Sequence, residues 1–275
     1  MKNKKSKYHK SFLKWPGSKF RVIDKVVNAL PQSHRLIEAF VGGANVFLNT
    51  EFDDYLLADI NADLIHVYNT LKTHGYAFID ECEELFHPQN NCERVYYDLR
   101  DEFNNSDFTT RKAAIFCYIN KCSYNGLIRY NRSHRLNTPF GHYKSIYFPR
   151  AEMEFFLAKA KKAKFICAPF EESLKHLRKF STVYLDPPFC DQDSKTKCFT
   201  AYSGHGFNLN DQDGLSKLAQ KLASRGIFVV LSNHDTEFTR RLYKGATFES
   251  FSVRRSISCD GANRKKAKEL LASWV

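Results

Sequence analysis

The sequence predicts an α/β protein with an open sheet and a helical domain inserted into it. Three observations predict this fold class. Short apolar runs alternate with helical stretches in the first and the last part of the chain. Between them, residues 61–122 show helical periodicity and no strand of sheet type. The tetrapeptide DPPF (186–189) follows a short buried strand, as loops do at the carboxyl ends of open α/β sheets.

The first elements follow one another in an order typical of a nucleotide-binding unit. Apolar residues three and four apart predict a helix over residues 22–30. RLIEAF (35–40) reads as a buried strand that runs into a glycine turn at residues 42–43. YLLA (55–58) reads as a second strand and ends at Asp59. Strand, glycine turn, helix, strand and acid is how such a unit opens.

The later elements restore the alternation after residues 62–145, which we interpret as an inserted domain. Residues 1–61 and 146–275 then form the α/β domain. Its expected helices cover residues 150–162, 171–179, 211–224 and 235–243. Its expected strands cover residues 164–168, 182–186 and 226–232, with a terminal strand or hairpin through 246–258. A last basic stretch reads as helix.

The composition favours a nucleic-acid partner. The chain has 275 residues, a formal net charge of +12 and 43% hydrophobic residues. No apolar run approaches the about 20 residues of a membrane span, and the amino terminus lacks the apolar part of a secretion signal. We therefore expect a cytoplasmic monomer that does not bind membranes. The eight Cys include no CxxC pair, so we expect reduced, buried thiols and no metal site.

The glycine turn after the first predicted strand is a candidate nucleotide site. AFVGGA lacks the full GxGxxG pattern, so Gly42 and Gly43 fit either a ligand close to the backbone or a plain tight turn. Asp59 could hold both hydroxyls of a ribose, or it could cap the next helix. ATP hydrolysis has no support, because the sequence has no GKS or GKT phosphate loop.

S-adenosylmethionine suits this turn better than a phosphate-bearing nucleotide, because it has an adenosine and no phosphates. Its carboxylate could meet Lys19, and Phe40 and Trp15 could pack beside it. The alternative for Trp15 is core packing at the entry to a helix.

The turn at residues 186–189 suits a flat ring that bears an amino group. The Asp186 carboxylate and a rigid carbonyl can accept the amino hydrogens, while the ring of Phe189 stacks on the base. This is chemistry on adenine or cytosine. The alternative is a plain loop, because short motifs often match by chance.

Residues 108–151 form a window without acids. These 44 residues hold eight Lys or Arg, nine Phe or Tyr and no Asp or Glu. Its loop-like part offers an exposed ring, Tyr124 or Tyr130, for stacking on a base or wedging into a duplex. The alternative is a solvated surface loop. Its basic residues, which can meet phosphates, are Arg129, Arg132, Arg135 and Lys144. The basic stretch at 253–271 fits phosphate contact and a solvated helix face equally well.

Taken together, these motifs resemble those of the D12-class DNA adenine-N6 methyltransferases of the DNA adenine methylase type. The resemblance runs from about Phe12 to the end of the sequence, in the family's order. Ala39 stands where a proline is usual. The matching segments are FLKWPGSK, LIEAFVGGANVFLNT, YLLADINADLIHVYN, YNGLIRYN, NTPFGHYK, DPPF, FTAYSGHGF, LSNHD, and RRSIS with ELLA.

The resemblance implies a seven-stranded Rossmann-like methyltransferase sheet with an inserted recognition domain. It implies S-adenosylmethionine as methyl donor, S-adenosylhomocysteine as product, and no metal. The substrate would be N6 of an adenine flipped out of double-stranded DNA, with GATC as target. The implied catalytic residues are Asp186, Pro187, Pro188 and Phe189. The implied cofactor residues are Trp15, Lys19, Phe40, Gly42, Gly43, Asp59, Phe170 and Asp186. The implied DNA-binding residues are Lys14, Tyr124, Asn125, Leu127, Arg129, Asn137 and Pro139.

Phe189 departs from the family's pattern, which has tyrosine there. Phenylalanine keeps the face that stacks on a base, worth about 1–3 kcal/mol, and loses the hydroxyl, so we expect activity to survive in reduced form. Two other interpretations stay open. One is a DNA-binding relative without turnover. The other is a methyltransferase acting on cytosine N4 or a protein amide; by resemblance, such enzymes favour Ser or Asn in place of Asp186.

Overall fold

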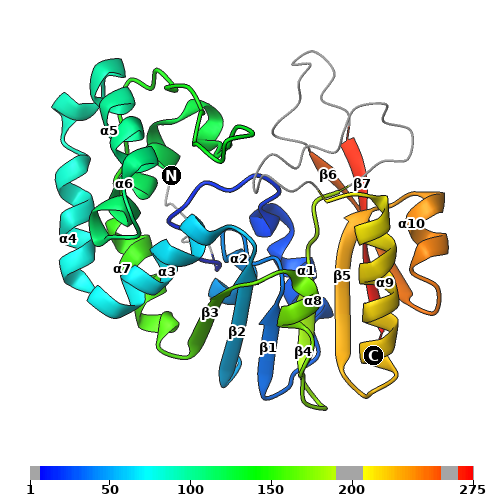
Figure 1. Ribbon diagram of the computed structural model, residues 1–275. Helices are drawn as coiled ribbons and strands as arrows, with labels where there is room; N and C mark the ends of the chain where they lie inside the picture. The colour runs from blue at the N-terminus through cyan, green and yellow to red at the C-terminus, as the bar shows by residue number, and fades with distance from the viewer. Residues whose placement is uncertain (1–6, 190–206, 255–265, 275) are drawn as a thin grey trace, which may run out of the picture.

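A seven-stranded sheet in the order β3-β2-β1-β4-β5-β7-β6 forms the centre of the α/β part (Figure 1). The structure is a computed structural model that describes residues 7–189, 207–254 and 266–274. Neighbouring strands from β3 to β5 pair in parallel, and β7 pairs antiparallel with both β5 and β6. The strands are β1 (Arg35–Glu38), β2 (Asp54–Asp59), β3 (Ala163–Cys167), β4 (Thr182–Leu185), β5 (Phe228–His234), β6 (Thr247–Arg254) and β7 (Lys266–Trp274).

The central strands are buried because helices cover both faces of the sheet. Successive side chains therefore enter different cores: Leu36 packs in one and Ile37 in the other, as do Tyr184 and Val183. One face carries the 3-10 turn η1 (Lys19–Val22), α1 (Ile23–Ala29) and α2 (Asn45–Leu48). The other carries α8 (Phe170–Ser173), α9 (Leu209–Ala223) and α10 (Glu237–Leu242).

Two predictions about these elements are wrong. The basic stretch expected to be helical forms β7, because pairing with β5 and β6 overrides the helical preference of its Ala, Lys, Glu and Leu residues. The helix expected over 171–179 is the single turn α8, after which the Leu177 carbonyl accepts a bond from the Arg225 guanidinium, 3.1 Å. The other predicted helices and strands are present with slightly different ends. The FTAYSGHGF motif, apart from its last residue, and residues 255–258 of the RRSIS motif lie outside the described residues.

Helices without an intervening strand occupy the chain between β2 and β3 and stand beside the β3 edge of the sheet (Figure 1). The longest are α3 (Ala62–His74), α5 (Glu93–Asn105) and α6 (Thr110–Cys122), with α4 (Tyr76–Leu85), η2 (Pro88–Asn90), η3 (Tyr124–Gly126) and α7 (Arg150–Ala160) between or after them. Helix α6 is buried on nearly all sides and packs on α3, α4 and α5. The helical part shares one hydrophobic core with the sheet. The domain limits at residues 62 and 145 stay a prediction.

The described cysteines are all free, but not all are buried. Cys82, Cys117 and Cys122 are buried, as expected, whereas Cys92 is half-buried and Cys167 is exposed. The expectation fails for Cys167, the last residue of β3, which shares a face with the buried Ala163 and Phe165 but lies at the end of the strand. Cys190, Cys198 and Cys259 lie outside the described residues.

No helix in the described ranges is both long and apolar enough to cross a membrane.

Candidate active site and nucleic-acid interface

The strand order brings the predicted cofactor and catalytic residues to one edge of the sheet. Strands β1 and β4 are neighbours. After β1 the chain continues to β2 on one side, and after β4 it continues to β5 on the other side. Ligands of open α/β sheets bind at the carboxyl ends of two strands related in this way. The glycine turn follows β1, Asp59 ends β2, Phe170 follows β3 and Asp186 follows β4. Residues more than a hundred positions apart therefore meet at the carboxyl ends of four adjacent strands.

The Asp186 carboxylate is held through one of its two oxygens. The Ser232 hydroxyl, from the adjacent β5, donates to Oδ1 over 2.6 Å, and the Lys19 ammonium lies 2.8 Å from the same atom. The Tyr184 hydroxyl in turn donates to Ser232, 3.1 Å. Asp186 is 19% exposed, so its carboxylate is partly open to solvent. In the part of the chain that the structure describes, both side-chain contacts of Asp186 go to Oδ1, which leaves Oδ2 available as an acceptor.

Lys19 connects the acid to the neighbouring aromatic ring. Its ammonium lies 4.5 Å from the centroid of the Phe189 ring, within the range of a cation–π contact. His234 also lies against this ring, edge-on at 4.6 Å between centroids. Lys19 therefore pairs with Asp186 and covers a face of Phe189, and its role toward the carboxylate of a cofactor stays a prediction. A base that stacks on this face requires the ammonium to move.

The glycine turn is shaped by Trp15. A Cβ added to Gly42 would lie 2.8 Å from Trp15 Cδ1, and one added to Gly43 would lie 3.0 Å from Trp15 Cβ. Gly42 also has a φ of +45°, which an L side chain rarely adopts. The Tyr68 hydroxyl donates to the Gly42 carbonyl, 2.5 Å. Trp15 packs on the turn and on the core beside it, so the two interpretations of this residue do not exclude each other.

Asp59 holds the other side of the same turn. Its Oδ2 accepts from the Gly42 amide and its Oδ1 from the Asn61 amide, both over 3.0 Å. Burial raises the pKa of Asp59, and these amides together with that of Ile60 oppose the rise. The alternative that Asp59 caps the following helix is wrong, because Asn61 caps α3 by accepting from Leu64 N.

Phenyl rings border the turn on the side of α8. Phe40 stacks on Phe170 with 5.7 Å between centroids, and Phe207 meets Phe40 edge-on at 5.9 Å. The set of an acid, a glycine turn and aromatic rings fits an adenosine-type cofactor: the rings offer a face for a flat base, and Asp59, which already accepts three backbone amides, keeps one of its about four lone-pair sites for a ligand hydroxyl. Lys19 is the member of the set whose observed contacts differ from the predicted role.

Glu38 is a site residue that the sequence reasoning missed. It is the last residue of β1, lies 2% exposed beneath the glycine turn, and has no hydrogen-bond partner for Oε1 in the described part of the chain. Burial raises its pKa to about 8, the Phe47 amide opposes the rise, and the Asp186 charge adds to it. Burial thus favours the neutral form of Glu38, and the signal in the sequence was an acid inside the otherwise apolar run LIEAF.

The loop of residues 123–145, which we call the recognition loop after its predicted role, presents Tyr124 to solvent. Tyr124 is 55% exposed, and its amide donates to the Pro139 carbonyl over 2.9 Å, which joins the two predicted DNA-binding segments. Asn125 has a positive φ of 55°, so the loop turns sharply under Tyr124, with Leu127 at its end. Tyr130 is not equivalent, because its hydroxyl donates to Asp63 over 2.6 Å. Of the two rings, Tyr124 is the one available to a base.

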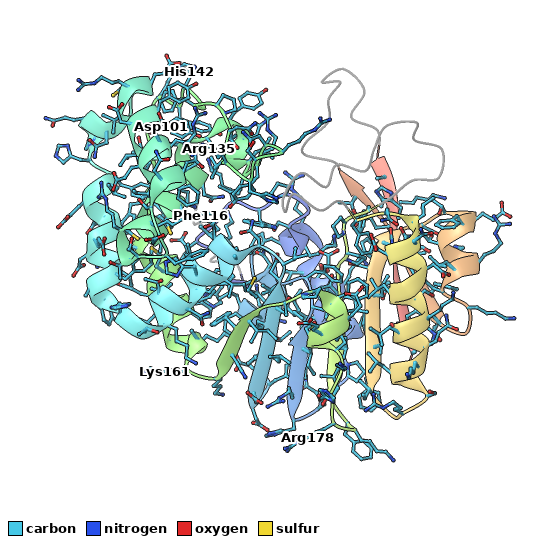
Figure 2. The ribbon with its side chains drawn as sticks, in the orientation of Figure 1. Asp101, Phe116, Arg135, His142, Lys161 and Arg178 are labelled. Atoms are coloured by element: carbon cyan, nitrogen blue, oxygen red, sulfur yellow. The ribbon has the colours of Figure 1, made fainter. Side chains whose placement is uncertain are left out.

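The Arg129 side chain is exposed, and its guanidinium is held in place by Asn137. Its Nε donates to Asn137 Oδ1 over 2.9 Å, and the Asn137 amide donates to the Arg129 carbonyl over 3.0 Å. Arg132, Arg135 and Lys144 are also exposed. Figure 2 shows Arg135 and His142 in the upper helical part, whereas Lys161 and Arg178 lie toward the opposite ends of the strands. The cations of the loop are thus exposed, and of the two rings Tyr124 and Tyr130 only Tyr130 is packed on the domain.

Lys14 is held between the recognition loop and helix α6. Its backbone amide and carbonyl both bond to the Asn120 side chain, and its ammonium donates to the Lys121 carbonyl over 3.0 Å. The ammonium also lies 4.2 Å from the centroid of the Tyr143 ring. Burial lowers the pKa of Lys14. Asn120 was missed from the sequence, although a lone amide in an otherwise apolar helical stretch was the available signal.

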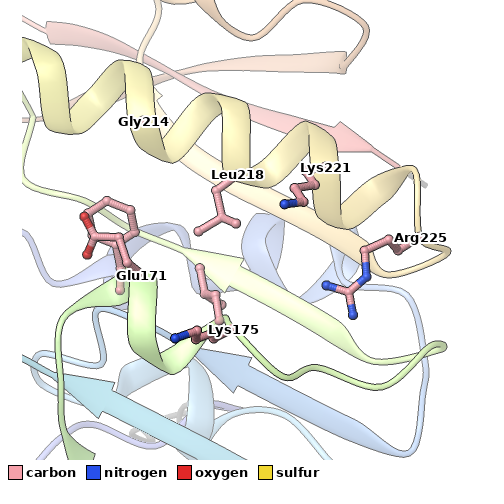
Figure 3. A pocket seen from close by; sticks show the side chains of 8 residues that line it. Glu171, Lys175, Gly214, Leu218, Lys221 and Arg225 are labelled. Carbon is pink, nitrogen blue, oxygen red and sulfur yellow. The ribbon is translucent and has the colours of Figure 1, made fainter.

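A separate hollow of about 290 Å³ lies between α8 and α9, away from the carboxyl edge (Figure 3). Lys175, Lys221 and Arg225 border it, and Phe170 and Leu218 contribute apolar surface. Only Phe170 belongs to the predicted site. In the described ranges, no group of three or more His, Cys, Asp or Glu is arranged to hold a metal ion.

Comparison with known proteins identifies one family over nearly the whole chain. The family of D12 class N6 adenine-specific DNA methyltransferases matches residues 15–257. A DNA adenine methylase of Vibrio cholerae is 48% identical over 270 residues, covering 98% of this chain and 97% of that protein. The DNA adenine methylase of Escherichia coli K12 is 46% identical over 268 residues, covering 98% and 96%. That of Haemophilus influenzae is 42% identical over 267 residues, covering 96% and 93%.

Proposed function

Because this chain belongs to the family of D12 class N6 adenine-specific DNA methyltransferases, we propose that it methylates N6 of a flipped adenine in double-stranded DNA at GATC, with S-adenosylmethionine as donor. The observation that carries the proposal is the position of Asp186. Its carboxylate lies at the carboxyl ends of the central strands, beside the glycine turn and the Phe189 ring, and among the described residues both of its side-chain contacts go to Oδ1.

Asp186 and the Pro187 carbonyl would accept the two hydrogens of the adenine amino group. This directs the nitrogen lone pair away from the base, which matters because ring delocalisation makes N6 a poor nucleophile. Ser232 fixes the carboxylate by its hydrogen bond to Oδ1. S-adenosylmethionine supplies an electrophilic methyl group when bound. Asp186 is also the nearest carboxylate to take the proton that the product amine must lose. Positioning of the reacting groups supplies much of the rate.

The base must leave the duplex before it reaches this site, because N6 is paired inside the helix. Unstacking costs a few kcal/mol, and stacking on Phe189 offsets it by about 1–3 kcal/mol. Tyr124, the exposed ring of the recognition loop, would fill the space in the duplex. As the base enters, the Lys19 ammonium would leave the face of Phe189. It would then exchange its contact with Asp186 for one with the carboxylate of S-adenosylmethionine.

Incorporation of labelled methyl groups into duplexes with and without GATC tests this function. We expect label in N6-methyladenine of the GATC duplex and little in a matched duplex whose four bases are scrambled. Label in cytosine or in RNA alone would contradict the substrate, and equal label in both duplexes would contradict GATC.

A second candidate is a DNA-binding relative with weak or no turnover. Two observations favour it: Phe189 replaces the usual tyrosine, and Lys19 is paired with the acid that would orient the amine. Tight binding of S-adenosylhomocysteine and GATC duplex without label in any duplex would support this candidate over the first.

A further inference from the structure

Two asparagines hold the backbone of the N-terminal segment, which we define as residues 8–18. Asn49, at the end of α2, accepts from the His9 amide over 2.7 Å and donates to the His9 carbonyl over 2.8 Å. Asn120, near the end of α6, likewise accepts from the Lys14 amide over 2.8 Å and donates to the Lys14 carbonyl over 2.7 Å. Each side-chain amide thus engages both polar groups of one residue, as a neighbouring strand would.

The two clamps differ in what else they touch. Asn120 also donates to the Gly126 carbonyl over 3.3 Å, so one side chain joins Lys14 to the recognition loop. Gly126 is packed against the same lysine: an added Cβ would lie 2.6 Å from Lys14 Cβ. Asn120 is fully buried, so a change in any of its bonds leaves a polar group without water to replace the partner. Asn49 bonds within the α/β part, to Asn45 and His9.

The segment continues directly from this clamp to the glycine turn. Trp15 follows Lys14 in the chain, and its indole ring packs on the backbone of Gly42 and Gly43. The Trp15 carbonyl accepts from the Ser18 amide over 3.2 Å, which fixes the chain just after the ring. One peptide bond therefore separates the residue clamped by Asn120 from the ring that shapes the turn (Figure 1, blue).

We propose that Asn120 is a positioning residue that couples DNA binding at the recognition loop to cofactor binding at the glycine turn. The proposal rests on the proposed function. A displacement of Gly126 by DNA moves the Asn120 amide, because its bonds to Lys14 and Gly126 share one NH2 group. Lys14 then carries Trp15 with it, and the packing of Trp15 on Gly42 changes. Because coupling between two sites is reciprocal, the cofactor alters DNA affinity by the same factor.

The test is a binding cycle with S-adenosylhomocysteine and a short duplex that carries one GATC site. Calorimetry gives the dissociation constant of S-adenosylhomocysteine without and with the duplex, and their ratio is the coupling factor. For the wild type we expect a factor of about 5 or more, within the usual range for coupled sites. In Asn120→Ala the factor should fall toward one, whatever the variant does to the affinity for each ligand alone, because the factor is a ratio of two dissociation constants of the same variant.

Two further variants separate coupling from simple loss of structure. Asn49→Ala removes the matched clamp without touching the recognition loop and should keep the wild-type factor. Asn120→Asp keeps the acceptor for the Lys14 amide but loses both donated bonds, so it should lower the factor even if Asn120→Ala does not fold. A wild-type factor of one, an unchanged factor in Asn120→Asp, or an equal loss in Asn49→Ala would each overturn the proposal. Methyl transfer by the wild type, assayed in parallel, distinguishes this outcome from failure of the proposed function.

Discussion

Replacing Glu38 with glutamine tests whether a neutral acid lies beneath the active site. Burial raises the Glu38 pKa from its ordinary 4.5 to about 8. Above pH 4.5 the unfolded chain releases this proton, whereas the folded protein keeps it until about pH 8. Below pH 4.5 Glu38 is protonated in both states, so it does not reduce the free energy of unfolding. That free energy falls as the pH rises above 4.5 and through the folded pKa of about 8. The shift corresponds to about 5 kcal/mol when complete.

Urea unfolding of the wild type and of Glu38→Gln from pH 5 to pH 9 measures this difference. Glutamine cannot ionise, so the wild type should lose about 4 kcal/mol of unfolding free energy relative to the variant over that range. Glu171→Gln, which removes an exposed acid, should follow the wild-type curve. If the curves for the wild type and Glu38→Gln run parallel, Glu38 is ionised in the folded protein and our assignment is wrong.

The other predictions concern the groups around the reacting site. Asp186→Ala should abolish methyl transfer and retain duplex binding in a gel shift, and normal transfer would contradict its role. Ser232→Ala removes a hydrogen bond to the charged carboxylate, so kcat should fall about tenfold; an unchanged kcat would mean that this bond does not orient the acid. Phe189→Ala should lower kcat/KM by about 10–100-fold, whereas Phe189→Tyr keeps the stacking face; equal losses would argue against stacking. Gly42→Ala puts a methyl group 2.8 Å from Trp15 and should weaken S-adenosylhomocysteine binding in calorimetry, whereas Gly214→Ala, with nothing within 4 Å, should raise Tm without affecting that binding.

The fold was largely predictable because its signals are local. Continuous apolar runs identified β1, β2, β4 and β5, since a strand covered on both faces needs little polar alternation. Strand β7 was missed for the opposite reason: its residues favour a helix in isolation, and only the neighbouring strands impose an extended chain. Beyond the end of α8 the chain is held by a bond from Arg225 to the Leu177 carbonyl, a contact that lies far along the sequence.

The candidate site was predictable where function sits at the end of a strand or in a loop. Asp186 and the glycine turn could be identified from the order of apolar and special residues alone. The pairing of Lys19 with Asp186 could not, because it depends on how η1 packs against β4. Asn120 was missed because its role depends on bonds to the backbone of Lys14, which is far away in the sequence.

The insertion of β7 between β5 and β6 has a consequence for how the chain matures. In the described sheet, β6 touches β7 and no other strand, so β6 cannot dock until residues 266–274 have been synthesised. Until then the edge of β5 beside Ser232 stays uncovered, and the acid-binding hydroxyl sits on an unfinished surface. Nascent chains and truncations that stop before residue 266 would expose a hydrophobic strand edge, which is a site for aggregation. A tag joined just after Trp274 would start at the core itself, because that side chain is 7% exposed.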